Sequence, residues 1–233
     1  MIQMKKFFWF TMALIMMIMP IAAMAAGKAS VTQECLFVTG TGSYDTFVFA
    51  EIKNIGDKPL SLDGGVIEVL DKDGNTIGNA TYLSFFPSVL APGETGYMCE
   101  DINVVGATAT SKAVDHMLTV TGKSESHWYT QKIESSGIIT EEENFSNVER
   151  YVDVIIKNNT EQPIIGPSYV YALYDKDGNL LFARNGSLYD IILPPQQTVI
   201  VRTTLYSDYT NIWEAKGVKP ERVETIVYDM IYK

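Results

Sequence analysis

Apolar and polar positions along most of this chain follow the pattern of short β-strands separated by turns. Residues 46–52 are rich in aromatic and β-branched side chains, and residues 151–156 alternate in part between apolar and polar side chains. Both runs end at Lys-Asn, and the residues that follow are typical of turns. By the same reasoning we expect strands at residues 65–70, 168–174 and 223–232.

Helical periodicity is nearly absent. Its one instance is residues 209–216, where we expect a short helix that crosses to the last strand. Short strands with turn signals between them, and almost no helix, predict an all-β antiparallel fold.

The chain also carries an internal repeat. The run Asp-Lys-Asp-Gly-Asn occupies residues 71–75 and 175–179, and Ile-Lys-Asn recurs at the same spacing, at residues 52–54 and 156–158. A third pair of blocks starts with Leu-Ala-Pro at residues 90–92 and with Leu-Pro-Pro at residues 193–195. The spacing of this pair is one residue shorter than that of the first two pairs. Three blocks in one order predict two homologous units.

These units set the expected domain organisation. We expect two tandem immunoglobulin-like antiparallel β-sandwiches from an internal duplication, at residues 26–134 and 135–233, with the join near residues 132–147. Each unit has about 100 residues, which suits a small sandwich domain.

The repeated Asp-Lys-Asp-Gly-Asn run has two interpretations. A calcium loop of the EF-hand type needs glycine at position 6 and glutamate at position 12. Here the glycine is fourth, and position 12 is Tyr82 in one copy and Gly186 in the other. Asp-Gly between apolar runs is instead a strong signal for a tight hairpin turn. We therefore expect a turn and no bound metal or cofactor.

In the second unit, Leu173, Tyr174 and Asp175 lead into the repeated turn, and Leu-Pro-Pro follows before the next strand. This arrangement resembles the FxLYD-type immunoglobulin-like domain of bacterial exported proteins. The first unit departs from it, because Leu70 stands where the tyrosine is expected. The resemblance implies a seven-strand-like sandwich without known catalytic residues, and it transfers no site. A telokin-like extracellular sandwich is similar enough to remain an alternative.

The N-terminus has the features of a secretory signal peptide. Lys5 and Lys6 precede an apolar run over residues 7–19, and small residues follow up to an Ala-Met-Ala site that ends at Ala25. We expect residues 1–25 to be the signal and the protein to be secreted or extracytoplasmic, at a bacterial cell envelope. The alternative is an uncleaved segment, since about 20 apolar residues can span a bilayer.

The composition excludes one class of partner. The formal net charge is −10, and no basic stripe is present. Nucleic-acid binding requires cationic side chains that neutralise phosphates, so we expect no nucleic-acid partner. Anionic membrane surfaces are disfavoured for the same reason.

Two cysteines, Cys35 and Cys99, leave two alternatives open. In an exported chain they can form a disulfide that closes a long loop. They can equally be two buried thiols.

No catalytic constellation is visible, and we expect the protein not to be an enzyme. The two histidines, His116 and His127, lack the spacings of zinc ligands. Ser124, Glu125 and His127 include the residue types of a catalytic triad, but a triad is defined by geometry and not by adjacency in sequence.

Four aromatic residues outside the repeated blocks are candidate binding residues: Trp128, Tyr206, Tyr209 and Trp213. Exposed aromatic rings can stack on sugars or anchor a protein partner. The alternative is that they pack between the two domains.

Two functional hypotheses follow. The first is a non-catalytic binding or structural module that acts through protein contacts at the cell envelope. The second is a carbohydrate-binding accessory protein, which requires Trp128 and Trp213 to be exposed. The sequence alone identifies neither the ligand nor the oligomeric state.

Overall fold

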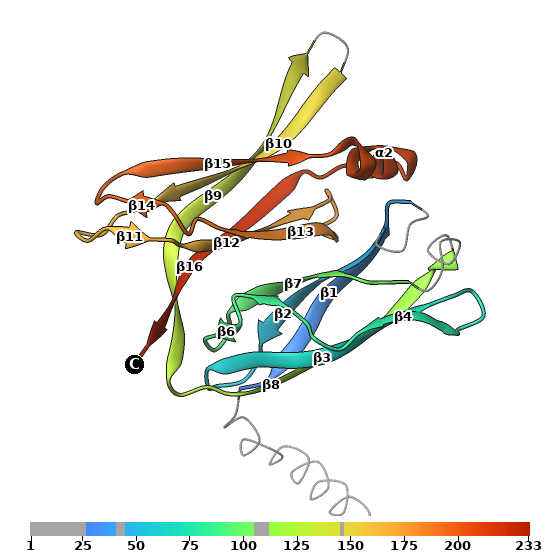
Figure 1. The fold of residues 1–233 in the computed structure, drawn as a ribbon, viewed down its shortest axis with the longest axis horizontal. Helices are drawn as coiled ribbons and strands as arrows, with labels where there is room; N and C mark the ends of the chain where they lie inside the picture. Colours follow the sequence, from blue (N-terminus) through green and yellow to red (C-terminus); the bar gives the residue numbers. More distant parts are fainter. Residues whose placement is uncertain (1–26, 41–44, 105–111, 145–146) are drawn as a thin grey trace, which may run out of the picture.

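The computed structural model describes residues 27–40, 45–104, 112–144 and 147–233, and the predicted signal peptide lies outside these ranges. The described chain consists mostly of antiparallel β-strands with one short helix (Figure 1), which confirms the all-β prediction. No helix in these ranges is long and apolar enough to cross a membrane.

The first half of the chain, which we call the first unit (residues 27–124), forms two sheets. One sheet has the order β1-β2-β7-β5 and the other has the order β4-β3-β6, with β8 paired to β3. The strands are β1 (Ala29–Val38), β2 (Thr46–Asn54), β3 (Leu60–Leu70), β4 (Thr76–Ala80), β5 (Phe85–Phe86), β6 (Val89–Leu90), β7 (Thr95–Asp101) and β8 (Asp115–Ser124).

The second unit (residues 128–233) forms a six-stranded sheet with the order β13-β12-β16-β9-β10-β15, and a separate pair, β11-β14. The elements are β9 (Trp128–Asn144), β10 (Asn147–Lys157), β11 (Ile164–Ile165), β12 (Ser168–Tyr174), β13 (Leu180–Ser187), β14 (Ile192–Leu193), β15 (Thr198–Leu205), α2 (Ser207–Ala215) and β16 (Arg222–Tyr232).

Strand β9 divides the six-stranded sheet into two parts. Its first part, Trp128 to Ile133, pairs with the end of β16. Its second part, Glu134 to Asn144, pairs with β10. The strand is continuous across the predicted join between residues 134 and 135, and both of its partners belong to the second unit (Figure 1).

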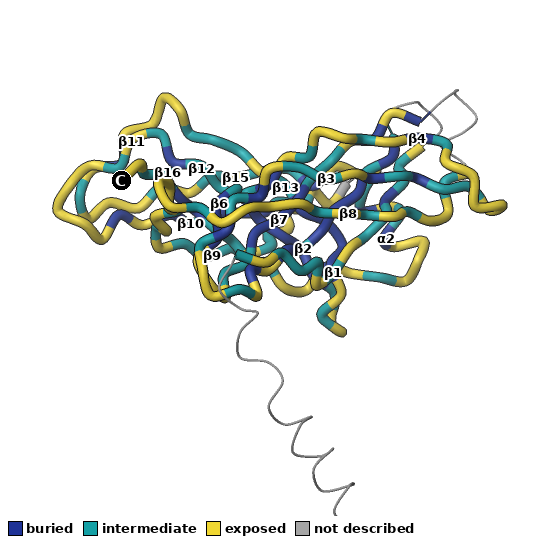
Figure 2. Tube along the Cα trace, turned by 90° about the horizontal axis from the view of Figure 1, so that it is seen from below, coloured by how far each residue is buried: buried dark blue, intermediate teal, exposed yellow. Residues whose placement is uncertain are grey.

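Strand β2 lies inside the sheet β1-β2-β7-β5, which we call the middle sheet, and it packs on both faces, so its sequence does not alternate strictly. Val48, Ala50 and Ile52 of β2 pack into a core against β3. Phe49, on the other face, packs into a second core with strands of the second unit. A strand covered on both sides reads as a continuous apolar run. Figure 2 shows these buried stretches in the interior of the molecule.

This second core joins the two units. Phe37, Phe49 and Tyr97 of the first unit belong to one buried cluster with most of β12 and β13. The ring centroids of Phe49 and Phe182 are 4.9 Å apart. Separating the units would expose these aromatic rings to water, so the apolar contact holds them as one body.

The repeated Ile-Lys-Asn blocks fold into matching local structures. The buried Asn54 amide donates to the carbonyl oxygens of Lys58 and Leu90, at 2.8 and 3.0 Å. The buried Asn158 amide donates to the equivalent carbonyls of Gln162 and Leu193, at 2.8 and 2.9 Å. In both units, one asparagine therefore ties a turn to the strand that returns beside it.

The Asp-Lys-Asp-Gly-Asn runs match in the same way and confirm the turn interpretation. The Asp71 carboxylate accepts from the backbone N–H groups of Asp73 and Asn75, both at 2.9 Å. The Asp175 carboxylate accepts from the backbone N–H groups of Asp177 and Asn179, at 2.9 and 2.8 Å. In each run the glycine has positive φ, 80° and 83°, which a side chain at that position would disfavour.

Candidate functional site

The four candidate aromatic residues do not form one site. Tyr209 and Trp213, both on α2, pack into the aromatic core between the units. The Trp213 ring centroid lies 5.9 Å from Phe37 and 6.1 Å from Phe182. Trp213 is only 3% exposed, so the requirement of the carbohydrate hypothesis that it be exposed is wrong. For these two residues, packing between the units is the correct alternative.

Trp128 and Tyr206 are exposed but belong to different parts of the molecule. Trp128 begins β9 beside the C-terminal strand, and Tyr206 precedes α2, at the other end of the second unit (Figure 1). Around Trp128 the structure assembles a group that we call the terminal aromatic cluster. Trp128 meets Tyr232 edge to face at 5.1 Å, and His127 stacks on Tyr232 at 6.0 Å.

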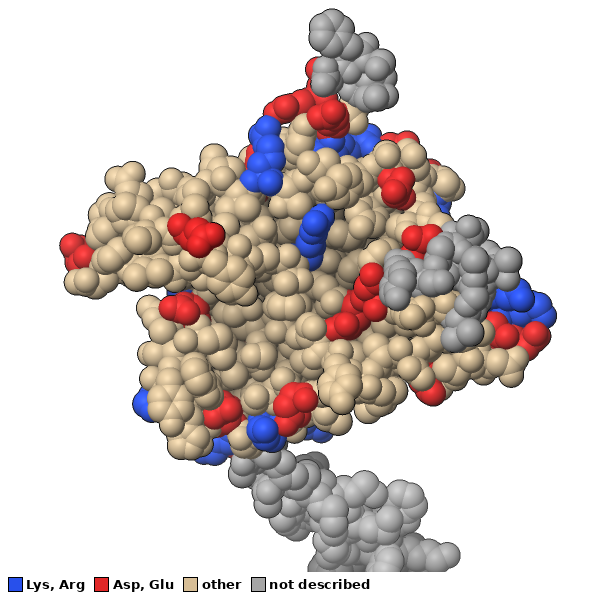
Figure 3. Space-filling view, viewed as in Figure 1, with Lys and Arg blue, Asp and Glu red and all other residues tan. Residues whose placement is uncertain are grey.

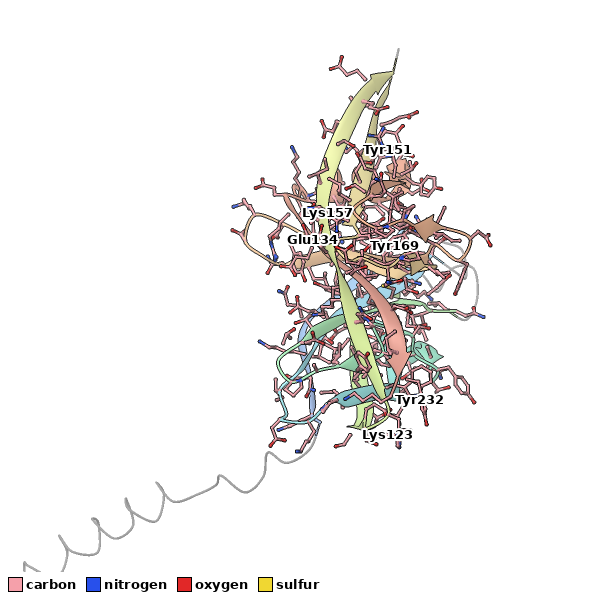
Figure 4. All side chains as sticks on the ribbon, turned by 90° about the vertical axis from the view of Figure 1, so that its left-hand side faces the viewer. Lys123, Glu134, Tyr151, Lys157, Tyr169 and Tyr232 are labelled. Atoms are coloured by element: carbon pink, nitrogen blue, oxygen red, sulfur yellow. The ribbon has the colours of Figure 1, made fainter. Side chains whose placement is uncertain are left out.

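A groove lies between β9, the end of β16 and residues 157–165. Its volume is about 560 Å³. Glu134 and Lys157, which are paired neighbours on β9 and β10, line it with an N–O distance of 4.0 Å, and Figure 4 shows them side by side. Amide and carboxylate side chains, including Gln131 and Asp229, line the rest of one wall. No pattern in the sequence predicts this groove, because it is assembled from three separate segments.

A third feature is an exposed apolar surface on the part of the second unit that carries β11 and β14, which we call the arm. Ile165 and Ile192, paired across these two strands, are 63% and 62% exposed. Tyr189 and Ile191 beside them are also exposed. The arm projects at the upper left of Figure 3, where its surface is largely uncharged.

In the first unit, the surface that corresponds to the arm is covered by other residues. Its β6 pairs with the start of β3 as β14 pairs with β11, so that Val89 corresponds to Ile192. Val89 is only 4% exposed. Thr130 of β9 donates a hydrogen bond to the Val89 carbonyl, and Lys132 of β9 forms an ion pair with Glu94 at 2.9 Å. Strand β9 of the second unit therefore covers β6.

A polar network crosses the contact between the units and was not predicted from the sequence. The hydroxyls of Tyr97 and Tyr174 are 2.9 Å apart. Tyr97 is also a donor to Glu224 at 3.1 Å, and Tyr174 is a donor to Glu51. The Arg222 guanidinium lies over the Tyr174 ring, 3.9 Å from its centroid.

Burial sets the protonation of this tyrosine pair. It raises the pKa of Tyr97 to about 12 and also raises the pKa of Tyr174. Both phenols therefore stay neutral at physiological pH. Neutral phenols beside two carboxylates act as hydrogen-bond donors, so the network links the two units.

The two cysteines are free thiols, so the disulfide alternative is wrong for this structure. Cys35 of β1 and Cys99 of β7 both pair with Phe49, on opposite sides of β2. Two strand spacings separate their Cα atoms by about 10 Å, whereas a disulfide needs less than about 7 Å. Burial raises the pKa of both thiols.

No group of three or more His, Cys, Asp or Glu residues that could hold a metal ion occurs in the described part of the chain. The His116 Nε2 atom lies 3.6 Å from a carboxylate oxygen of Glu34.

Comparison with models of known families finds no match, and no curated protein is significantly similar to the chain. The resemblance to FxLYD-type domains stays a prediction.

Proposed function

We propose that this chain is an exported, non-catalytic binding or structural module that acts through protein contacts at the cell envelope. We further propose that it consists of two immunoglobulin-like β-sandwich units from one duplicated ancestor. The matching networks of Asn54 and Asn158 and the matching turns of Asp71 and Asp175 support the duplication. The strand order β1-β2-β7 also recurs as β9-β10-β15, and β4-β3-β8 recurs as β13-β12-β16.

The observation that carries the proposed protein contact is the exposed apolar surface of the arm. In the first unit the corresponding β6 is covered by β9, which buries Val89. In the second unit Ile165 and Ile192 lie open to solvent among the described residues. Exposed apolar groups at a position that is otherwise an interface are typical of a protein contact.

The shared core between the units supports a role in which the protein presents the arm to a partner protein. Because Phe49 and Tyr97 pack into the core of the second unit, the arm is held on a rigid body. A rigid surface loses little conformational entropy on binding.

The test is site-directed crosslinking in the native envelope, with a photoreactive residue in place of Ile192 in the full chain. A matched control replaces Ile200 of β15, which is 60% exposed on an edge strand of the six-stranded sheet. We expect a discrete crosslinked protein at position 192 and none at position 200. A lack of crosslinks at 192, together with a monomeric mass in solution, would refute the proposal.

A second candidate function, carbohydrate binding, is favoured by the terminal aromatic cluster. Trp128 and Tyr232 are exposed and in edge-to-face contact, and exposed aromatic rings can stack on sugars. Its test is the tryptophan emission of the full chain across a glycan panel, with Trp128→Ala as the variant. Emission that no glycan changes would eliminate this candidate.

A further inference from the structure

A cleft runs along the second part of β9, between this strand and the segment that links α2 to β16. It comprises two adjoining cavities of about 200 and 660 Å³. Both are lined by Ile139 and Glu141 of β9 and by Lys219 and Pro220 of the segment between α2 and β16. The larger cavity extends along β9 to Gly137, and the smaller one extends inward to α2.

The backbone edge of β9 along this cleft pairs with no other strand of the described ranges, although Val223 and Thr225 of β16 pack so closely on Gly137 that a side chain there would meet them. β16 pairs with β9 only as far as Ile133 and Val227. From Glu134 to Asn144, the only strand that pairs with β9 in the described ranges is β10, on its other side. An unpaired strand edge presents a row of N–H and C=O groups that can hydrogen-bond to an added strand.

One residue that lines the inner cavity carries a buried donor without an acceptor. Trp213 lines this cavity together with Ile139, Val218 and Pro220. Its indole Nε1 is buried and has no hydrogen-bond partner among the described residues. A buried N–H left unpaired is unfavourable, so a ligand atom that accepts from it gains affinity.

Charged residues fix the walls of the inner cavity. Arg150 of β10 bridges Glu141 of β9, at 2.9 Å, and Glu214 of α2, at 2.8 Å. This bridge ties the helix to the sheet. The cavity is therefore held open by ion pairs on one side and by the packing of α2 on the other.

We infer that this cleft binds an extended peptide segment of a partner protein, which adds to the six-stranded sheet along β9. One side chain of that segment enters the inner cavity and places a carbonyl or hydroxyl oxygen beside Trp213. The inference rests on the proposed function and names the kind of partner. A strand fits because alternate side chains of an added strand point into pockets while its backbone pairs with the edge. A sugar does not fit here, because the Trp213 ring is buried and offers no face for stacking.

The test uses the full chain as bait for a phage-displayed library of linear peptides. The selected peptides are synthesised, and binding is followed in the Trp9→Phe, Trp128→Phe variant, in which Trp213 is the only tryptophan. We expect a change in Trp213 emission and slower hydrogen exchange of the β9 amides between residues 137 and 141. Thr210→Phe fills the inner cavity that Thr210 lines and should weaken binding at least tenfold.

Two further variants make the result specific. Trp213→Phe removes only the indole donor, and calorimetry should show several-fold weaker binding to a protein whose circular dichroism is unchanged. Ile200→Asp, at the opposite edge of the same sheet, should leave the affinity unchanged. The inference is overturned if no peptide is selected, if Thr210→Phe and Trp213→Phe both bind normally, or if exchange protection maps to β13 or β15.

The two proposals can fail separately. If an envelope protein crosslinks at position 192 and still binds the Thr210→Phe variant, the function stands and the cleft is not its site. If peptides bind the cleft but no envelope protein crosslinks to the full chain, the cleft stands and the proposed contact through the arm fails.

Discussion

The repeated asparagine network allows a quantitative test, because replacing Asn158 by alanine removes four hydrogen bonds at one buried side chain. Its amide donates to the carbonyls of Gln162 and Leu193, and its Oδ1 accepts from the backbone N–H and the hydroxyl of Thr160, at 2.9 and 2.7 Å. Water can replace the bonds to the exposed Thr160 and Gln162, but it cannot reach the buried contact with the Leu193 carbonyl.

The expected loss follows from these partners. A buried carbonyl left unpaired costs about 1–3 kcal/mol, and each of the three other bonds contributes about 0.5–1.5 kcal/mol, less where water replaces it. We expect Asn158→Ala to lower the free energy of unfolding by about 3–4 kcal/mol. Asn158→Asp should lower it further, because a carboxylate oxygen would then face two carbonyl oxygens. Asn54→Ala in the first unit should match Asn158→Ala to within about 1 kcal/mol, since Asn54 also makes four bonds: its amide donates to two carbonyls, and its Oδ1 accepts from the backbone N–H groups of Lys28 and Gly56.

The assay is equilibrium unfolding in urea at pH 7, followed by far-UV circular dichroism. Asn159→Ala is the matched control, because Asn159 is the exposed neighbour and its amide bonds only to the exposed Glu134. We expect that control to lose less than about 1 kcal/mol. The reasoning is refuted if Asn158→Ala and Asn159→Ala lose the same free energy at equal m-values.

Three further predictions concern the buried groups of the middle sheet. Phe49→Ala should lower the free energy of unfolding by about 3–5 kcal/mol. Because Phe49 lies in the core shared by both units, the substitution should also split one calorimetric transition into two. A single transition would contradict the shared core. Cys35 and Cys99 should react with Ellman's reagent only after unfolding, because burial raises the pKa of both thiols. Rapid labelling of both thiols in native buffer, or no labelling in urea, would contradict this prediction. Because burial raises the pKa of Tyr97 to about 12, its stabilising contribution is complete below pH 10 and is lost as pH rises from 10 to 12. Tyr97→Phe should remove part of that loss, as measured by urea unfolding between pH 9 and pH 12, and an unchanged profile would exclude Tyr97 as its source.

The sequence by itself determined the local structure of this protein. The expected strands at residues 168–174 and 223–232 correspond to Ser168–Tyr174 and Arg222–Tyr232, and the expected helix at residues 209–216 corresponds to Ser207–Ala215. The repeated Asp-Lys-Asp-Gly-Asn run was predicted as a turn and is one in both places. These features could be predicted because turn geometry and the period of side chains along a strand act over a few neighbouring residues.

Only the tertiary structure decided which apolar positions are covered and by what. Trp213 and Trp128 look alike in the sequence, but α2 places Trp213 in the core between the units, whereas Trp128 is exposed at the start of β9. Cys35 and Cys99 were candidates for a bridge until the strand order put β2 between them. The cleft beside β9 exists because that strand leaves β16 at Ile133 and continues along β10. Such outcomes depend on contacts between segments far apart in the chain. The side-chain pattern of a single strand does not indicate which surface will cover its faces or which strand will pair with its edge.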